Sequence, residues 1–253
     1  MAKRLLGVIS ALPEEFAHLS DQSGESSEIA GFCFWQGPIA GREAIFVESG
    51  AGKVNAGVAA ALLLDRFGCR ALLLCGAAGG LDPALGIGDI VIGTNNIQHD
   101  YGVEKQDGFW HIQPGSRPSR GEDFTPGYAL SDELLVRLRA SLAGLVLEPL
   151  PLDVGAGQRK PGIHFGPILT GDSFVNSERT RQRLYQRFAA QAVEMEGGAV
   201  AQIARRWGED IPVVNVRCLS DLAGADSHLD FRAFLAVAAR YASQVAHRLA
   251  PVI

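Results

Sequence analysis

The sequence predicts an α/β protein in which helices pack in layers against a sheet. Short apolar runs alternate with helical patterns along the chain, as expected for buried strands and the helices that cover them. Glycine is frequent, at 30 of 253 residues, and it clusters where apolar runs pass into helical patterns. No linker, repeat or low-complexity tract divides the chain, so we expect a single domain over residues 1–253.

The first elements follow from apolar runs and their boundaries. Residues 5–10 are almost continuously apolar and predict a buried strand, and the turn from Pro13 to Glu15 opens a helix with acids in its first turn. Residues 32–36 and 44–49 are apolar segments separated by glycines and a proline. These two segments therefore predict a hairpin.

The next three elements are strongly apolar. Residues 53–66 are rich in Ala and Leu and predict a well-buried helix. Residues 71–80 form an apolar run that ends in glycines, which predicts a buried strand. Residues 89–98 follow a glycine-containing turn and predict a further strand.

The middle of the chain is less regular. From Tyr101 to about Pro126 it is polar, aromatic and rich in Pro and Gly, and we interpret this segment as a long surface or interface loop. Leucines recur at helical spacing over residues 131–145, which predicts a helix with one apolar face. Residues 149–162 are a second irregular segment.

The last third returns to regular alternation. Residues 164–171 predict a strand, residues 175–189 a charged helix and residues 196–207 a more apolar helix. Residues 211–220 predict another buried strand, and residues 231–250 predict a closing amphipathic helix.

Composition and charge exclude two classes of partner. Acidic side chains outnumber basic ones by 28 to 23, and no basic stripe with interleaved aromatics is present, so we expect no nucleic-acid partner. No run of about 18 apolar residues occurs, so we expect no membrane-spanning helix. Lys3-Arg4 and the brief apolar run after them lack the cleavage site of a signal peptide. We therefore expect a cytoplasmic protein.

Motifs for metals and cofactors are missing from the sequence. The cysteines at 33, 69, 75 and 218 are scattered, which is typical of small buried apolar residues in a reducing compartment. There is no nucleophile elbow, phosphate-binding loop or HExxH, and residues 48–57 lack the glycine spacing of a dinucleotide site. A structural hydrogen bond explains the adjacent pair His99-Asp100 as well as catalysis does. We expect no metal and no cofactor.

The candidate catalytic side chains are carboxylates near the ends of predicted strands. Ser220 and Asp221 end the strand at 211–220, Glu196 opens a helix and Glu15 follows the first strand. Ligands of α/β sheets collect at the carboxyl ends of the strands. A helix cap or a first-turn acid explains each carboxylate alone equally well, so it is their combination that carries information.

This combination resembles the nucleoside phosphorylase superfamily, and in particular its hydrolytic branch, the 5′-methylthioadenosine/S-adenosylhomocysteine nucleosidases. The segments that carry the resemblance are, in chain order, ALPEE (11–15), ESGAGKVNA (48–56), GAAGGLDPALGIGDIV (76–91), TGDSF (170–174), AVEMEGGA (192–199) and VRCLSDLAGADSHLDF (216–231). The resemblance implies a three-layer α/β/α sandwich around a mixed central sheet. It also implies a homodimer that binds a small-molecule nucleoside without a metal or an organic cofactor.

The resemblance also implies roles for individual residues. Asp221 matches the acid that protonates purine N7, Glu196 the carboxylate that binds the ribose hydroxyls, and Glu15 the base that activates water. The other residues expected to contact substrate are Phe174, which would stack on the purine, Val175, whose backbone would read its edge, Met195 on the ribose face, Arg217 near the water, and Ser220, Ala77 and Gly79. Carboxylates suit this chemistry because departure of a purine leaves positive charge on the sugar.

The resemblance implies hydrolysis of the N-glycosidic bond of a 5′-modified adenosine, which is methylthioadenosine, S-adenosylhomocysteine or 5′-deoxyadenosine. Hydrolysis is favoured over phosphorolysis. A phosphorylase must hold a phosphate dianion with arginines and backbone amides, whereas this chain has Glu14-Glu15 in its N-terminal loop and Cys75 before Gly76. A phosphate-dependent purine nucleoside phosphorylase, a futalosine-type nucleoside hydrolase and a relative that only binds nucleosides are the alternatives.

Two departures from the family pattern affect substrate choice. Ala77 stands where nucleosidases often have Ser, which removes a possible hydrogen bond near the water. The segment 101–126 also differs from the family, in a region that helps to form the dimer contact and the pocket for the 5′ substituent. The apolar and aromatic content of residues 97–112 independently suggests a partner surface.

Overall fold

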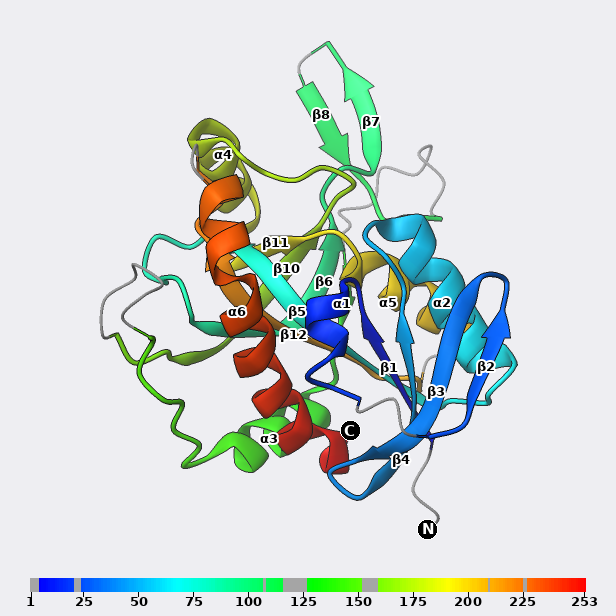
Figure 1. Cartoon of the computed structure of the whole chain (residues 1–253). Coiled ribbons are helices and arrows are strands. Elements are labelled where there is room, and N and C mark those ends of the chain that lie inside the picture. Colours follow the sequence, from blue (N-terminus) through cyan, green and yellow to red (C-terminus); the bar gives the residue numbers. More distant parts are fainter. Residues whose placement is uncertain are drawn as a thin grey trace.

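A computed structural model describes residues 5–20, 24–106, 108–115, 127–151, 159–208, 210–224 and 227–253. Across these residues ten strands form one mixed sheet, and helices cover both of its faces (Figure 1). The predicted α/β class with a mixed central sheet is confirmed. The strands are β1 (Leu6–Ser10), β2 (Ser26–Ile29), β3 (Phe32–Ile39), β4 (Arg42–Glu48), β5 (Ala71–Gly80), β6 (Ile90–Gln98), β9 (Tyr128–Ala129), β10 (Ile163–Thr170), β11 (Ala192–Glu194) and β12 (Val213–Asp221), with β7 (Gly102–Lys105) and β8 (Gly108–His111) forming a separate hairpin.

The helices form the two outer layers. They are α1 (Pro13–Phe16), α2 (Lys53–Asp65), α3 (Asp132–Leu142), α4 (Glu178–Phe188), α5 (Gly197–Trp207), α6 (Ser227–Leu249) and the short 3₁₀ helix η2 (Ala250–Val252). Buried side chains of α1, α3 and α6 share one core with the sheet, and those of α2 and α5 share the core on the opposite face. In Figure 1, α6 runs along the near face of the sheet.

Strand β5 shows how the sequence builds both cores. Its side chains are buried along the strand, and successive residues point to opposite faces as in any strand. Leu73 and Cys75 therefore join the core beneath α6, while Leu72 and Leu74 join the core beneath α2. A strand buried on both faces has to be continuously apolar, which is why this run could be recognised in the sequence.

The sheet closes on itself at one end. Its strand order is β11-β10-β6-β12-β5-β1-β4-β3-β2, and β11 also pairs antiparallel with β5. The pairings β5–β12–β6–β10–β11–β5 form a closed ring of strands. This ring brings the end of β11, the glycines of β5 and the end of β12 together, since Val193 lies opposite Gly79 and Asp221 opposite Gly79 on its other side.

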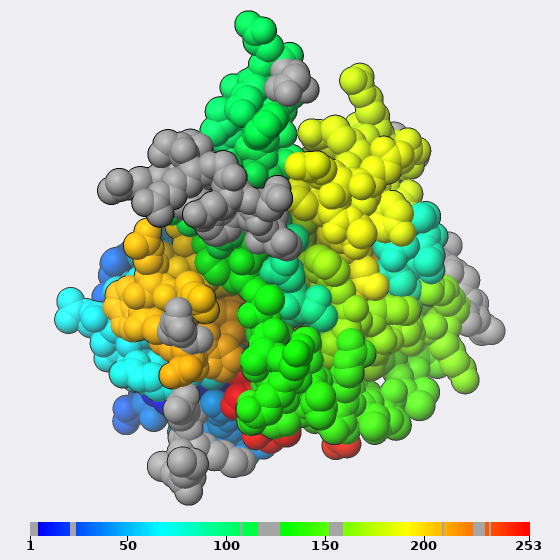
Figure 2. Space-filling view, turned by 180° about the vertical axis from the view of Figure 1, so that it is seen from behind, coloured from blue at the N-terminus to red at the C-terminus, as the bar shows by residue number. Residues whose placement is uncertain are grey.

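The predicted elements agree with the structure within a few residues, but the short strands β2, β9 and β11 were not predicted, and the middle of the chain contains one clear error. Residues 102–105 and 108–111 were expected in a loop but form the two strands of the hairpin β7–β8, which projects from the body in Figures 1 and 2. The polar strand Gly102–Lys105 has no apolar alternation to reveal it. Residues 107 and 116–126 of the predicted loop, and 152–158 of the second irregular segment, lie outside the described residues.

The predicted hairpin is longer than expected. β3 extends to Ile39 and β4 begins at Arg42, so the connection is only Ala40 and Gly41, with φ values of 47° and 76°. Positive φ at both central residues is the geometry of a type I′ turn, whose twist matches that of the flanking strands.

No helix within the described part of the chain is long and apolar enough to cross a membrane.

Candidate active site

One cavity lies at the carboxyl ends of β5 and β12, with a volume of about 250 Å³. Every site residue predicted from the sequence lines it: Glu15, Ala77, Gly79, Phe174, Val175, Met195, Glu196, Arg217, Ser220 and Asp221. These residues come from five segments far apart in the chain. Their grouping around one cavity is a fact of the fold, and their individual roles remain predictions.

Glu15 is the buried member of the pair Glu14-Glu15. Its Oε1 accepts the backbone N–H of Ala77 at 2.9 Å, and its Oε2 accepts those of Ala11 at 2.9 Å and Leu12 at 3.1 Å. Burial raises the pKa of Glu15, although Arg217 and these backbone donors act in the opposite direction. Glu14 is exposed to solvent, so only Glu15 can act in the cavity.

Gly76 makes the close approach of Glu15 possible. A Cβ placed on Gly76 would lie 2.5 Å from Oε1 of Glu15 and 2.8 Å from Nη1 of Arg217. Any side chain at this position would therefore displace the carboxylate or the guanidinium. The crowding therefore requires glycine at position 76.

Arg217 is held by Glu194, a residue to which the sequence assigned no role. Its Nη2 donates to Oε2 of Glu194 at 2.5 Å and lies 3.4 Å from Oε2 of Glu196. Its Nε donates to Oδ1 of Asn215 at 2.7 Å. Burial alone would lower the pKa of Arg217, but the surrounding carboxylates outweigh it and raise the pKa, so the side chain stays charged.

Both carboxylate oxygens of Glu194 accept hydrogen bonds from other groups of the protein. Besides Arg217, it accepts the backbone N–H groups of Glu196 at 3.1 Å and Gly197 at 2.8 Å, and the hydroxyl of Thr170. We infer that Glu194 fixes Arg217 and the start of α5, leaving Glu196 free to face a ligand.

Glu196 receives few hydrogen bonds for a buried carboxylate. Its Oε1 accepts the backbone N–H of Gly52 at 2.9 Å, and Oε2 has only the long contact to Arg217. Burial raises the pKa of Glu196 to about 7; Arg217 opposes this shift and Glu194 adds to it. Glu15, Glu194 and Glu196 together place more negative than positive charge around Arg217, which favours a cation nearby.

Asp221 sits at an irregularity of β12. The register between β12 and β5 shifts between Leu219 and Asp221, as in a β-bulge. Bulges re-aim side chains and are common beside active sites. The Oδ1 of Asp221 accepts the backbone N–H of Ala223 at 2.8 Å, and the hydroxyl of Ser220 lies 3.0 Å from its Oδ2. The carboxyl is 1% exposed, so its position is fixed.

The remaining wall of the cavity is apolar. Phe174 is 46% exposed and packs edge-to-face on Phe231, with ring centroids 5.7 Å apart. Val175 and Met195 continue this wall. Lining residues without a predicted role are Ala11, Leu12, Ala51, Ala78, Ser173, Val193, Glu194 and Phe231. Each of them lies within one of the six segments that carry the resemblance to the nucleosidases, and Phe231 is the last residue of the segment 216–231.

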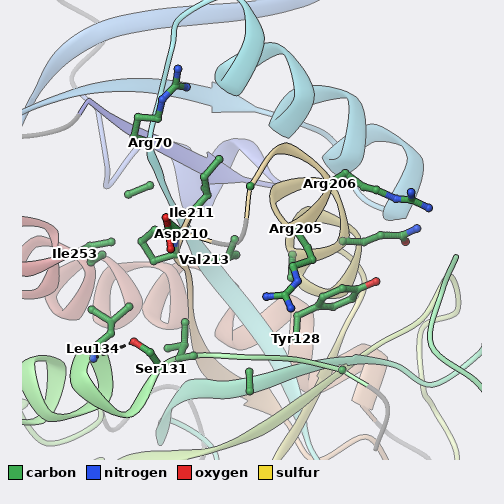
Figure 3. Close-up of a pocket in the computed structure, with 18 of the residues that line it drawn as sticks. Arg70, Tyr128, Ser131, Leu134, Arg205, Arg206, Asp210, Ile211, Val213 and Ile253 are labelled. Atoms are coloured by element: carbon green, nitrogen blue, oxygen red, sulfur yellow. Dashed lines mark hydrogen bonds between the residues drawn. The ribbon is translucent and has the colours of Figure 1, made fainter. Parts of the chain in front are cut away.

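A second, wider hollow of about 980 Å³ lies elsewhere, between α5, β9 and the start of α3. Arg70, Arg205 and Arg206 are among its lining residues, and Figure 3 shows their guanidinium groups apart from one another. None of the predicted site residues lines this hollow. Within the ranges that the structure describes, no group of three or more His, Cys, Asp or Glu is placed to hold a metal ion.

Comparison with known proteins agrees with this fold. The model of the phosphorylase superfamily matches residues 5–253, which is almost the whole chain. The fold is therefore that of the phosphorylase superfamily.

Individual relatives narrow the assignment. A 5′-methylthioadenosine/S-adenosylhomocysteine nucleosidase of Mycobacterium bovis is 43% identical over 250 residues, covering 98% of this chain and 97% of that protein. The Streptococcus pneumoniae nucleosidase of this name, solved with a transition-state inhibitor, has a TM-score of 0.81 and 29% identity, covering 98% of this chain and 99% of its own. The Colwellia psychrerythraea enzyme, solved with adenine, has a TM-score of 0.80 and 31% identity, covering 98% and 96%. The chain belongs to the family of 5′-methylthioadenosine/S-adenosylhomocysteine nucleosidases.

Proposed function

We propose that this protein hydrolyses the N-glycosidic bond of a 5′-modified adenosine, such as methylthioadenosine or S-adenosylhomocysteine, releasing adenine and the 5′-substituted ribose. The observation that carries the proposal is that Glu15, Glu196 and Asp221 are all buried around one cavity. The named activity of the relatives supports it.

In the proposed reaction, water adds to C1′ of the ribose while the bond from C1′ to N9 of the purine breaks. Asp221 supplies a proton to N7, so that the base leaves as neutral adenine. Glu196 binds the ribose hydroxyls and stabilises positive charge that develops on the sugar. Glu15 takes a proton from the attacking water, beside Arg217.

The apolar wall supports purine binding. Phe174 presents an exposed aromatic face that a purine can stack against. Val175 follows it and also lines the cavity, so its backbone would contact the edge of the base, and Met195 would line the ribose. Gly79 has no Cβ to fill the space 3.1 Å from Oδ1 of Asp221, which keeps the site open for the purine.

The charge of the cavity favours water over phosphate as the nucleophile. Among the described residues that line it, Arg217 is the only basic one, and it is already paired with Glu194. A phosphate dianion would face Glu15 and Glu196 at short range, which is unfavourable in a buried site. Neutral water meets no such repulsion.

The experiment that tests this function is product analysis from methylthioadenosine, with and without phosphate. We expect adenine and free methylthioribose in both buffers. Sugar 1-phosphate formed only when phosphate is present would instead establish a phosphorylase. Tight adenine binding without turnover of any nucleoside would establish a binding protein, and turnover of a futalosine-type nucleoside in preference would reassign the substrate.

The acid side of the pH profile should report on Glu196. The ionised form of Glu196 binds the sugar cation, and the pKa of Glu196 is about 7. We therefore expect kcat/KM to be low at acidic pH, to rise as the pH approaches about 7, and to level off above it. Besides burial, the charged groups that face Glu196 act on its pKa: Arg217 lowers it, and Glu194 and Glu15 raise it. Measuring kcat/KM from about pH 5 to 9 tests this; an unchanged limb in Glu196→Gln would contradict the assignment.

We further propose that the protein is a cytoplasmic homodimer. The projecting hairpin β7–β8, with Trp110 half exposed, supports a partner surface in the region that was predicted to form one.

A further inference from the structure

The loop between β10 and α4 carries Phe174 and Val175, the residues proposed to bind the base. Phe174 packs only edge-to-face on Phe231, and nearly half of its surface is exposed. Such a ring is not fixed by burial. The position of Phe174 must therefore depend on how the backbone of this loop is held.

Polar contacts hold the start of the loop at Asp172. The Oδ2 of Asp100 accepts the backbone N–H of Asp172 at 2.9 Å, and its Oδ1 accepts the ammonium group of Lys53 at 2.7 Å. In return, Oδ1 of Asp172 accepts the backbone N–H of Lys53 at 2.9 Å, and its Oδ2 lies 3.6 Å from the ammonium group. Lys53, Asp100 and Asp172 thus form a closed set of contacts, which we call the loop clamp.

The loop clamp has a second support in His99. The ring of His99 packs against Gly171, where a Cβ would lie 2.3 Å from its Nε2. The backbone N–H of Gly171 also donates to the carbonyl of Glu194 at 3.0 Å. The pair His99-Asp100, noted in the sequence without a role, therefore contacts two successive residues of this loop.

The loop clamp also connects the two halves of the cavity. Gly52, the residue before Lys53, donates its backbone N–H to Glu196 on the sugar side. The N-terminus of α2 consequently touches both Glu196 and Asp172, so the base-binding loop and the sugar-binding carboxylate share one anchor.

We propose that Asp100 and Lys53 are positioning residues that fix the loop of residues 171–175 and thereby place Phe174 and Val175 against the base. Neither side chain belongs to a hydrophobic core, so replacing it removes no core packing. The inference rests on the proposed function in one respect, that this loop binds the base.

The test uses Asp100→Ala, Asp100→Asn and Lys53→Met in the full chain, with Asp65→Asn as the matched control. Asp65 pairs with Arg66 on the exposed end of α2 and does not contact the loop. Hydrogen exchange of residues 171–175 in the ligand-free protein should accelerate about tenfold in Asp100→Ala, the factor expected for losing one charge-assisted contact.

Kinetics on methylthioadenosine provide the second readout. Asp100→Ala should raise KM about tenfold and change kcat less than about threefold. The reason is that the substitution loosens the loop that binds the base but leaves the groups that act in the chemical step in place. Asp100→Asn should lie between wild type and Asp100→Ala, since its amide oxygen can still accept the N–H of Asp172 but has lost its charge. Lys53→Met should behave like Asp100→Ala.

Each outcome decides the inference. Unchanged exchange in the loop together with an unchanged KM would overturn it, as would a loss confined to kcat. An effect of equal size in Asp65→Asn would show a general loss of stability and overturn it too. If wild type fails to turn over any nucleoside, the proposed function fails, while the exchange experiment still decides whether the loop clamp holds residues 171–175.

Discussion

Replacing Asp221 with asparagine is expected to lower kcat about a thousandfold, while the protein stays folded. General acids contribute roughly 10²–10⁴-fold to such reactions, and an amide cannot transfer a proton to N7. The purine would then have to leave as an anion. In the wild-type structure the backbone N–H of Ala223 donates to Oδ1 of Asp221 at 2.8 Å. The side-chain oxygen of asparagine can accept the same hydrogen bond, so the local structure should survive.

Adenine release from methylthioadenosine, with a thermal melt of each variant, measures this effect. Ser220→Ala is the matched control, since it removes the hydroxyl 3.0 Å from the carboxylate but leaves the acid. We expect a much smaller loss there. A sugar whose leaving group departs without protonation, such as 4-nitrophenolate, should narrow the gap between wild type and Asp221→Asn. Normal turnover by Asp221→Asn on methylthioadenosine would exclude this residue as the acid.

The elements that could be predicted are those whose own residues determine burial. Strand β5 and helix α2 are apolar along their length, and the sequence alone places them well. The three-residue strand β11 could not be predicted, because it exists through pairing with β10 and β5 rather than through any local pattern. Strand β2 is polar and exposed at the sheet edge, so it also lacks an apolar signal.

The same distinction holds for the site. Carboxylates at strand ends could be identified because the ends of apolar runs are visible in the sequence. The sharing of Arg217 between Glu194 and Glu196 could not be predicted, because it depends on the pairing of β11 with β10 and β5 within the ring of strands. The contacts of Lys53 with Asp100 and Asp172 likewise join segments that are remote in the chain.

Replacing Glu15 with glutamine is the second change with a large expected effect. The carboxylate accepts N–H groups on both oxygens, from Ala77 on one and from Ala11 and Leu12 on the other. Glutamine has only one acceptor oxygen, so its NH₂ group would face a backbone donor on one side. It also cannot take a proton from water. We expect kcat to fall about a thousandfold, within the usual range for a general base.

This change also separates the two candidate nucleophiles. A hydrolase needs a base for water, whereas phosphate is already ionised and needs none, so a phosphorylase should retain most of its turnover in Glu15→Gln. Binding of adenine, measured by calorimetry, should change little, because Glu15 lies on the water side of the proposed site. Glu14→Gln is the control, since Glu14 is exposed one residue away and should turn over normally. Retained hydrolysis in Glu15→Gln would assign activation of the water to another group. Glu196 is then the first candidate, because Glu194, the other lining carboxylate near Arg217, already accepts four hydrogen bonds.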